Sequence, residues 1–281
     1  MRCIGIIGAG RWGRNIAKSF AKKAHVKKVA SSGNLVNLQK MQDVVPGIIP
    51  SSIEQILEDK EIEAVVVAVP MENLADIALQ CMKSGKHIFL EKPAATSKEK
   101  ALLLHNCAED KVCLVNYLYL VDPSYAAFKS AIRKAKTSKI SFVWKKWGTF
   151  NNDIVLNLVS HELSILFDTF QPEKVKVLEQ TNVDEDEICL MLQVDNIVAE
   201  MYINRKSKSK MKSISCETSK GFFMWTPGIF AHDDTELSIN DATNLLDLQR
   251  DIFLDKIKND PGYTNLSLAE KILTTIEEIK S

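Results

Sequence analysis

The sequence predicts a doubly wound parallel α/β domain followed by an α+β domain, which is built on an open, mainly antiparallel sheet covered by helices. Up to about residue 118, short apolar runs alternate with stretches of helical period, as in proteins with a parallel sheet. Beyond that point, strand-like stretches follow one another with short connections, which is typical of antiparallel sheets. We therefore expect two domains, 1–118 and 119–281, a number that fits a chain of 281 residues.

The strands expected in the first domain are short runs rich in isoleucine and valine. Residues 3–7 read CIGII, and 64–70 read AVVVAVP, a buried strand that stops at a proline. Residues 72–84 carry apolar side chains every three or four positions, which indicates an amphipathic helix. The other strands are expected at 26–31, 87–93 and 112–117, and the other helices at 12–24, 53–57 and 96–104.

In the second domain, strands are expected at 140–147, 174–178, 187–194, 197–204, 212–218 and 221–225, with helices near Pro123, over 156–170 and at the end of the chain. Trp144 alternates with Ile140 and Phe142, which favours a place in the core. Lysines alternate at 206, 208, 210 and 212. If extended, these four lysines share one face and attract a diphosphate, although such a run is more often a solvated hairpin or a protected edge.

Composition excludes several classes of function. The 36 Lys+Arg balance the 36 Asp+Glu, which argues against nucleic acid or an anionic membrane as partner. The longest apolar run is 64–69, whereas a bilayer span needs about 20 residues. The N-terminus does not resemble a signal peptide, the six cysteines form no CxxC pair, and the histidines have no metal-ligand spacing. We therefore expect a cytoplasmic protein with no metal.

A glycine-rich turn indicates a dinucleotide site. Residues 8–13 read GAGRWG, directly after a strand and at the start of a helix. Gly8 would allow the tight turn, Gly10 the approach of a pyrophosphate, and Gly13 the close packing of helix on strand. Arg11 and Trp12 begin the helix whose N-terminal N–H groups would bind the phosphates.

The end of the second strand bears on the choice of cofactor. NAD-specific sites usually carry an acidic residue there, to bind the ribose 2′-hydroxyl, and this chain has Ser31 and Ser32 instead. Two serines could bond a 2′-phosphate, and Lys27 and Lys28 are close in sequence. This favours NADP slightly over NAD. The alternative is that they are turn serines in a protein that takes either cofactor.

The segments GAGRWG, AVVVAVP and GKHIFLEKP occur in the order and spacing of the Gfo/Idh/MocA oxidoreductases, which the chain resembles over essentially its whole length. The stretches 114–125 (LVNYLYLVDPSY) and 153–166 (DIVLNLVSHELSIL) look most like the family's nucleotide-sugar and surface-polysaccharide branch. The resemblance implies a Rossmann domain that binds NAD(P). It also implies a C-terminal sheet that binds substrate and joins subunits into a homodimer or homotetramer.

The resemblance also implies roles for individual residues. Lys92 of the EKP motif would reach the reacting hydroxyl and the nicotinamide region, while Glu91 and Pro70 would help to hold the cofactor. His161 matches the family histidine that serves as acid or base. The family carries an aspartate four residues earlier, and this chain has Asn157, which shares a helix face with His161 and can orient a substrate but carries no charge.

Tyr117 and Tyr119 are further candidates to line the substrate site, although tyrosines at strand ends more often serve packing. We expect an NAD(P)-dependent oxidoreductase that exchanges a hydride with a ring hydroxyl or ketone of a sugar or nucleotide sugar, with the proton handled by Lys92 and His161. Two alternatives stay open. Asn157 favours a dinucleotide-binding regulator without turnover, and the chain length fits a biliverdin-reductase-like enzyme, against which the HELS segment argues.

Overall fold

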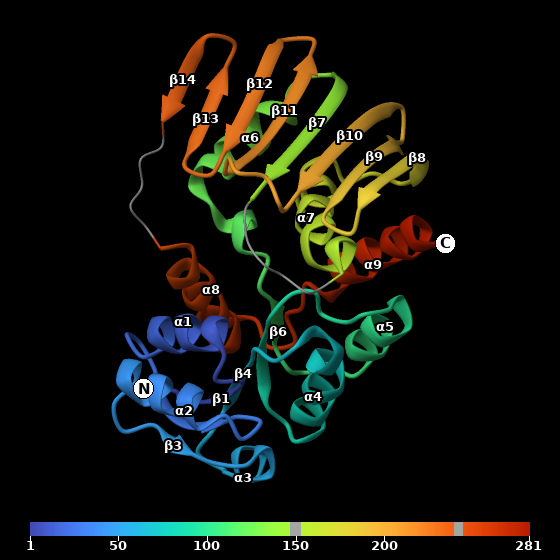
Figure 1. Ribbon diagram of the computed structural model, residues 1–281. Coiled ribbons are helices and arrows are strands. Elements are labelled where there is room, and N and C mark those ends of the chain that lie inside the picture. The colour runs from blue at the N-terminus through green and yellow to red at the C-terminus, as the bar shows by residue number, and fades with distance from the viewer. Residues whose placement is uncertain (147–152, 239–243) are drawn as a thin grey trace. The chain divides into compact units, whose positions relative to one another are not determined.

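The computed structural model describes residues 1–146, 153–238 and 244–281 (Figure 1). They form two compact units. The first comprises Met1–Asn116 and Asn244–Glu270, and the second Tyr117–Thr243 and Lys271–Ser281. The expected second domain runs without a break from 119 to 281, whereas in the structure residues 244–270 belong to the first unit.

The first unit contains a six-stranded sheet in the order β3-β2-β1-β4-β5-β6, with every neighbouring pair parallel. The strands are β1 (Cys3–Ile7), β2 (His25–Ala30), β3 (Ile49–Pro50), β4 (Ala64–Val67), β5 (His87–Leu90) and β6 (Cys113–Val115). The strand order reverses between β1 and β4, so the doubly wound fold predicted from the alternation of strands and helices is confirmed.

Five helices connect these strands: α1 (Arg11–Phe20), α2 (Leu35–Val44), α3 (Ile53–Leu57), α4 (Met71–Lys83) and α5 (Lys98–Asn106). The sequence does not predict α2 or β3. Helix α2 buries only Met41, and both residues of β3 are exposed. Neither element therefore has the apolar periodicity by which an element is recognised in a sequence.

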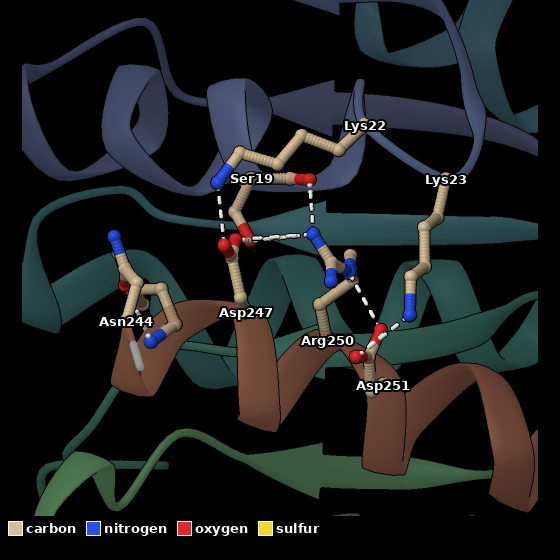
Figure 2. Close-up of polar contacts among 8 residues, drawn as sticks. Ser19, Lys22, Lys23, Asn244, Asp247, Arg250 and Asp251 are labelled. Atoms are coloured by element: carbon tan, nitrogen blue, oxygen red, sulfur yellow. Dashed lines mark hydrogen bonds and ion pairs between the residues drawn. The ribbon is translucent and has the colours of Figure 1, made fainter. Parts of the chain in front are cut away.

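Helix α8 (Leu245–Asn259) packs on α1 within the first unit (Figure 2). The buried guanidinium of Arg250 donates from Nη1 to the backbone carbonyl of Ser19, at 2.8 Å. The ring of Phe253 lies 5.9 Å from that of Phe20, centroid to centroid. These contacts explain why a segment so late in the sequence belongs to the first unit. The local sequence pattern of α8 does not predict them.

The second unit contains an eight-stranded sheet in the order β14-β13-β12-β11-β7-β10-β9-β8. Its strands are β7 (Thr137–Lys145), β8 (Val175–Asp184), β9 (Glu187–Val194), β10 (Ile197–Asn204), β11 (Met211–Thr218), β12 (Gly221–Thr226), β13 (Ile229–His232) and β14 (Thr235–Ser238). The β7–β10 pair is parallel and the other neighbours are antiparallel, so the mainly antiparallel sheet is confirmed. The short strand β13 and the edge strand β14 beside it are not predicted.

Helical segments accompany this sheet: η1 (Leu118–Val121), α6 (Pro123–Ile132), the π-helix η2 (Val155–Val159), α7 (Ser160–Phe170) and α9 (Leu266–Lys280), the last of which begins in the first unit. Ile140, Phe142 and Trp144 of β7 are buried, as their alternation predicts. In β11 the buried residues of the same alternation are Lys212, Ile214 and Cys216, so a lysine lies on the core face.

The less favoured interpretation of the lysine run, four extended lysines on one face, is therefore wrong. Lys206, Lys208 and Lys210 lie exposed in the turn between β10 and β11, as a solvated hairpin requires, but Lys212 lies in the strand and is buried. Within the described ranges, none of the helices combines the length and hydropathy that crossing a membrane demands.

Candidate functional site

The register of the parallel sheet aligns the carboxyl ends of five strands. The aligned residues are Ala30, Ile7, Val67, Leu90 and Val115. The residues that follow them lie along the same edge: Ser31, Gly8, Ala68, Glu91 and Asn116. Open α/β sheets bind ligands at this edge, beside the point where the strand order reverses. The fold therefore gathers the glycine turn and the EKP segment at one place.

Two glycines of the turn are required by packing. Gly8 has a φ of +111°, and a Cβ on it would lie 2.2 Å from the carbonyl oxygen of Ala68. A Cβ on Gly13 would lie 1.9 Å from the carbonyl oxygen of Gly8. Any side chain at either position would force β1, β4 and α1 apart.

Gly10 differs from these two because a Cβ there would meet no atom within 4 Å. Gly10 is also the N-cap of α1, and no side chain of the described chain caps that helix. The first N–H groups of a helix have no partner within the helix and carry a partial positive charge. The turn thus leaves donors facing open space, and this fits the pyrophosphate of a dinucleotide.

A side chain next to the glycine turn holds it in place through hydrogen bonds. Arg14 donates to the carbonyl oxygen of Ala9 at 2.7 Å and to Oδ1 of Asn37 at 3.1 Å. The predicted cofactor residues Arg11 and Trp12 form the exposed start of α1, and Pro70 is the N-cap of α4. Arg14 is not predicted. Its position one turn into the helix is the signal that could have found it.

Ser31 is half-buried and Ser32 exposed, directly after β2. The two nearby lysines are engaged elsewhere, since Lys27 Nζ lies 2.7 Å and Lys28 Nζ 2.9 Å from the same carboxylate oxygen of Asp59. The contact raises the pKa of Lys27 and lowers that of Asp59. Of these four residues, the two serines alone therefore favour NADP.

Glu91 and Lys92 follow β5, and both are half-buried. Asn116 donates from Nδ2 to Glu91 Oε1 at 2.7 Å, across the ends of β5 and β6. Burial raises the pKa of Glu91, although this bond and the charge of Lys92 oppose the rise. Within the described chain, Oδ1 of Asn116 is buried without a hydrogen-bond partner. Asn116, which the sequence analysis did not single out, thus fixes the EKP segment.

His161 lies on α7 in the second unit, against a group of rings from three other elements. Its centroid is 5.0 Å from that of Trp144 and 5.7 Å from that of Tyr119. The Trp225 ring lies 5.9 Å from Tyr119. We call Tyr119, Trp144 and Trp225 the aromatic wall. Burial raises the pKa of Tyr119 to about 12, so its phenol is neutral at physiological pH. The other candidate tyrosine, Tyr117, is buried.

A buried pair of opposite charges lies against the same wall. Nζ of Lys212 is 2.6 Å from Oε1 of Glu162, and 4.1 Å and 4.7 Å from the ring centroids of Trp144 and Tyr119. Burial lowers the pKa of Lys212 and raises that of Glu162, while the contact between them opposes both shifts. Oε2 of Glu162 has no hydrogen-bond partner in the described chain.

Neither Lys212 nor Glu162 is predicted from the sequence to be a buried residue of the site. Lys212 shares the alternation of Ile214 and Cys216, which placed it on the core face of its strand. Glu162 lies four residues from Leu158 and from Leu166 on an apolar helix face. The signal in the sequence was a charged residue at a core position of each element, and the two charges are opposite in sign.

Asn157 lies within η2, which leads directly into α7 and His161. Asn157 and His161 are both half-buried. π-helical turns inside helices often occur at functional sites. The carboxylate of Asp153 is engaged by the N–H of Val155 at 2.9 Å and by Lys280 at 2.6 Å, so it does not replace the aspartate that is absent at position 157. Lys92 belongs to the first unit, whereas Asn157 and His161 belong to the second.

No cluster of three or more His, Cys, Asp or Glu able to hold a metal ion occurs among the residues that the structure describes.

Known proteins with similar sequences include several dehydrogenases. scyllo-Inositol 2-dehydrogenase (NAD(+)) of Bacillus subtilis is 28% identical over 144 residues, a match that covers 50% of this chain and 42% of that protein. The matched part thus spans less than half the length of this relative.

Solved structures share the fold over the whole chain. UDP-N-acetylglucosamine 3-dehydrogenase of Acidithiobacillus ferrooxidans has a TM-score of 0.86 at 17% identity, and the likeness covers 99% of this chain and 96% of that one. Biliverdin reductase of Synechocystis, bound to biliverdin and NADP+, has a TM-score of 0.82 at 18% identity, with 99% and 97% covered. At these identities the likeness shows the fold alone.

The family resemblance predicted from the glycine turn and the EKP segment is confirmed by a direct match. Residues 2–119 match the Gfo/Idh/MocA family, described as an oxidoreductase family with an NAD-binding Rossmann fold. This region holds the glycine turn and the residues of the EKP segment, and it ends where the first unit passes into the second. Over residues 2–119, which are less than half of the chain, the sequence is therefore similar to the Gfo/Idh/MocA oxidoreductases.

Proposed function

We propose that this protein is an NAD(P)-dependent oxidoreductase that exchanges a hydride with a ring hydroxyl or ketone of a sugar, polyol or nucleotide sugar. The observation that carries the proposal is the register of β1, β4 and β5, which aligns the glycine turn and Glu91–Lys92 along one edge of the sheet. The dehydrogenases to which the chain is similar act on inositol and on a UDP-sugar, and they supply the class of substrate.

The first unit supplies the cofactor-binding residues of the proposal. The N–H groups at the start of α1 bind the pyrophosphate, and Gly10 leaves the space for it. Arg11 and Trp12 flank this position, and Pro70 and Glu91 border it along the sheet edge. When bound, the nicotinamide supplies the hydride acceptor or donor.

Proton exchange is assigned to Lys92 and His161. Oxidation of an alcohol needs a base for the hydroxyl proton, and reduction of a ketone needs an acid. A histidine is suited to both tasks near neutral pH. Asn157 orients the substrate by hydrogen bonds, and Tyr119 contributes to the substrate site through the ring that faces His161. Tyr117, being buried, supports this site through packing.

For the cofactor we propose that both NADH and NADPH bind, with a modest preference for NADPH. No acidic residue occupies positions 31 and 32, so neither form of the ribose is repelled. With Lys27 and Lys28 held by Asp59, the two serines are the groups left to bond a 2′-phosphate. The preference is therefore expected to be less than about tenfold in Kd.

We further propose that the protein assembles into a homodimer or homotetramer through one face of the eight-stranded sheet, the face that carries Val143 and Tyr202. That face carries a hollow of about 380 Å³, lined by side chains that include Val143, Met191, Glu200 and Tyr202. Light scattering after size exclusion tests this. A variant with Met191→Lys should lower the mass to that of a monomer, and a wild-type monomer contradicts the proposal.

The first experiment is a titration of the purified protein with NADH and with NADPH, followed by nicotinamide fluorescence. Protein cleared of carried-over cofactor and shown to be folded is required. The better cofactor is then used in a screen of polyols, sugars, nucleotide sugars and biliverdin. We expect saturable binding and turnover of a compound with a ring hydroxyl or ketone.

The outcomes separate the alternatives. Failure to bind either cofactor contradicts the oxidoreductase proposal. Binding with turnover of biliverdin alone replaces the substrate class. Binding without turnover of any compound favours a dinucleotide-binding regulator.

A further inference from the structure

The charge pair beside His161 is not explained by stability. Glu162 is fully buried and Lys212 nearly so. Removing two charges from water is costly, and apolar side chains of similar volume in place of a buried ion pair are often as stable or more so. Oε2 of Glu162 lacks a partner in the described chain, which adds to the cost. Stability therefore does not account for this buried ion pair, and we look for a functional role.

The pair and the imidazole share the same rings. Lys212 Nζ lies 4.1 Å from the Trp144 centroid and the imidazole centroid lies 5.0 Å from it, so the two are less than about 10 Å apart. Tyr119 is a second shared ring. A single charge at this distance, in a buried site that salt screens weakly, acts on a neighbouring titration.

As they stand, the two residues carry no net charge between them. Of the other ionisable groups around this cluster, the phenol of Tyr119 is neutral at physiological pH. The carboxylate of Asp122, after η1, accepts hydrogen bonds from Ser124 and is unchanged in every variant below. Asn157 carries no charge.

We propose that Lys212 and Glu162 are positioning residues for His161: they hold the aromatic wall on which the imidazole rests and keep its surroundings free of net charge. His161 then exchanges a proton near neutral pH without the carboxylate that the family places at position 157. The inference rests on the proposed function for the role of His161. It goes beyond that function because it assigns work to two residues with no part in binding cofactor or substrate.

The test changes the charge in both directions and then restores the balance. E162Q removes the negative member of the pair, K212M removes the positive member, and the double variant removes both. The titration of His161 is followed by NMR of its imidazole, which is assigned with H161Q. We expect its pKa to fall in E162Q, to rise in K212M, and to return close to the wild-type value in the double variant. Shifts of about half a unit to one unit are expected for the single variants.

E162Q is the single variant expected to stay folded, because the amide oxygen still accepts from Lys212 and the rings still face the ammonium. The double variant leaves no unpaired charge. Circular dichroism checks that E162Q and the double variant are folded. If K212M does not fold, these two variants are sufficient to test the proposal. K210M is the matched control, because it removes an exposed charge two residues away and should not move the imidazole.

An imidazole that titrates in folded E162Q as in the wild type overturns the inference. So does a shift of the same sign in E162Q and K212M, because loosening of the packing would produce it. The readout needs no substrate. Absence of dehydrogenase activity therefore counts against the proposed function alone, and an unmoved imidazole against the positioning role alone.

Discussion

Arg250 of α8 donates a hydrogen bond from its buried guanidinium to the backbone carbonyl of Ser19 in α1, at 2.8 Å. The same guanidinium pairs with Asp247 at 3.0 Å and with Asp251 at 2.8 Å, as Figure 2 shows. We expect R250M to lower the free energy of unfolding by about 2 kcal/mol, because a carbonyl and two carboxylates lose a buried partner. Urea denaturation followed by circular dichroism measures it.

The control for this prediction is K258M, an exposed lysine on the same helix. It should change the free energy of unfolding by less than about 0.5 kcal/mol. Equal losses in the two variants would show that the contact of Arg250 with Ser19 does not hold α8 on the first unit.

Replacement by alanine should lower the stability of the protein at Gly13 and its affinity for the cofactor at Gly10. A Cβ on Gly13 collides with the carbonyl oxygen of Gly8, so G13A should lose stability. A Cβ on Gly10 meets no protein atom, and its φ of −62° suits alanine, so G10A should unfold like the wild type. G10A should nevertheless bind NADH and NADPH roughly tenfold or more weakly, because the methyl group occupies the space proposed for the pyrophosphate.

Thermal unfolding and nicotinamide fluorescence read the two effects separately, and each variant is the control for the other. Wild-type affinity in G10A would place the pyrophosphate elsewhere. Wild-type stability in G13A would mean that the turn can open to admit a methyl group.

These residues show why part of the fold could be predicted and part could not. Strands β1 and β4 are continuous buried runs, and β9 and β10 alternate buried with half-buried residues. Their positions therefore follow from the local sequence. The packing of α8 on α1 depends on Arg250, whose partner is 231 positions away. Periodicity carries no information about contacts at that separation.

The same division holds at the candidate site. The glycine turn and the EKP segment are contiguous motifs, and the sequence alone places them. Lys212 and Glu162 are 50 positions apart and form a pair only because β11 and α7 face one core. A lysine in a basic run looks solvated, and its alternation with Ile214 and Cys216 was the one sequence signal against that interpretation. The register of β11 with β7 sets Lys212 against Trp144 in the core.

The Asp59 carboxylate predicts a pH dependence of stability. Its pairing with Lys27 and Lys28 holds its folded pKa below the unfolded value of about 3.9. The stabilisation is therefore fully present above about pH 4 and is lost as the pH falls through the lower folded pKa. We expect the difference in urea midpoint between the wild type and D59N to stay constant from pH 8 to about pH 5 and to close below about pH 4.

D43N is the control, because Asp43 lies exposed on α2 and its removal should not open such a gap. If the gap between wild type and D59N persists unchanged at pH 3, the pairing with the two lysines is not its source.

Replacement of Lys92 or His161 should affect turnover far more than cofactor binding. In K92M and H161Q we expect kcat/KM to fall by about 10²- to 10⁴-fold, the usual contribution of a general acid or base. The Kd for NADH or NADPH should change little in H161Q, since the cofactor-binding residues of the proposal lie in the first unit. Steady-state rates with the substrate found in the screen, together with fluorescence titrations, measure both quantities.

K83M, which changes an exposed lysine at the end of α4, is the control for these variants and should keep the wild-type rate. Retention of full activity in H161Q would remove His161 from the proton transfer and leave it as part of the packing of the aromatic wall.

Asn157→Asp separates an enzyme from a regulator that only binds a dinucleotide. A carboxylate on η2, one helical turn before His161, stabilises the imidazolium and raises the pKa of His161. In the oxidation direction the imidazole must be deprotonated, so the rising limb of kcat/KM should move to higher pH by about half a unit to one unit. N106D, at the exposed end of α5, adds the same charge elsewhere and should leave the profile in place. A regulator without turnover gains no activity from N157D. An enzyme whose profile is unmoved would show that Asn157 orients the substrate without acting on His161, and the charge balance of Lys212 and Glu162 would then alone set its proton exchange.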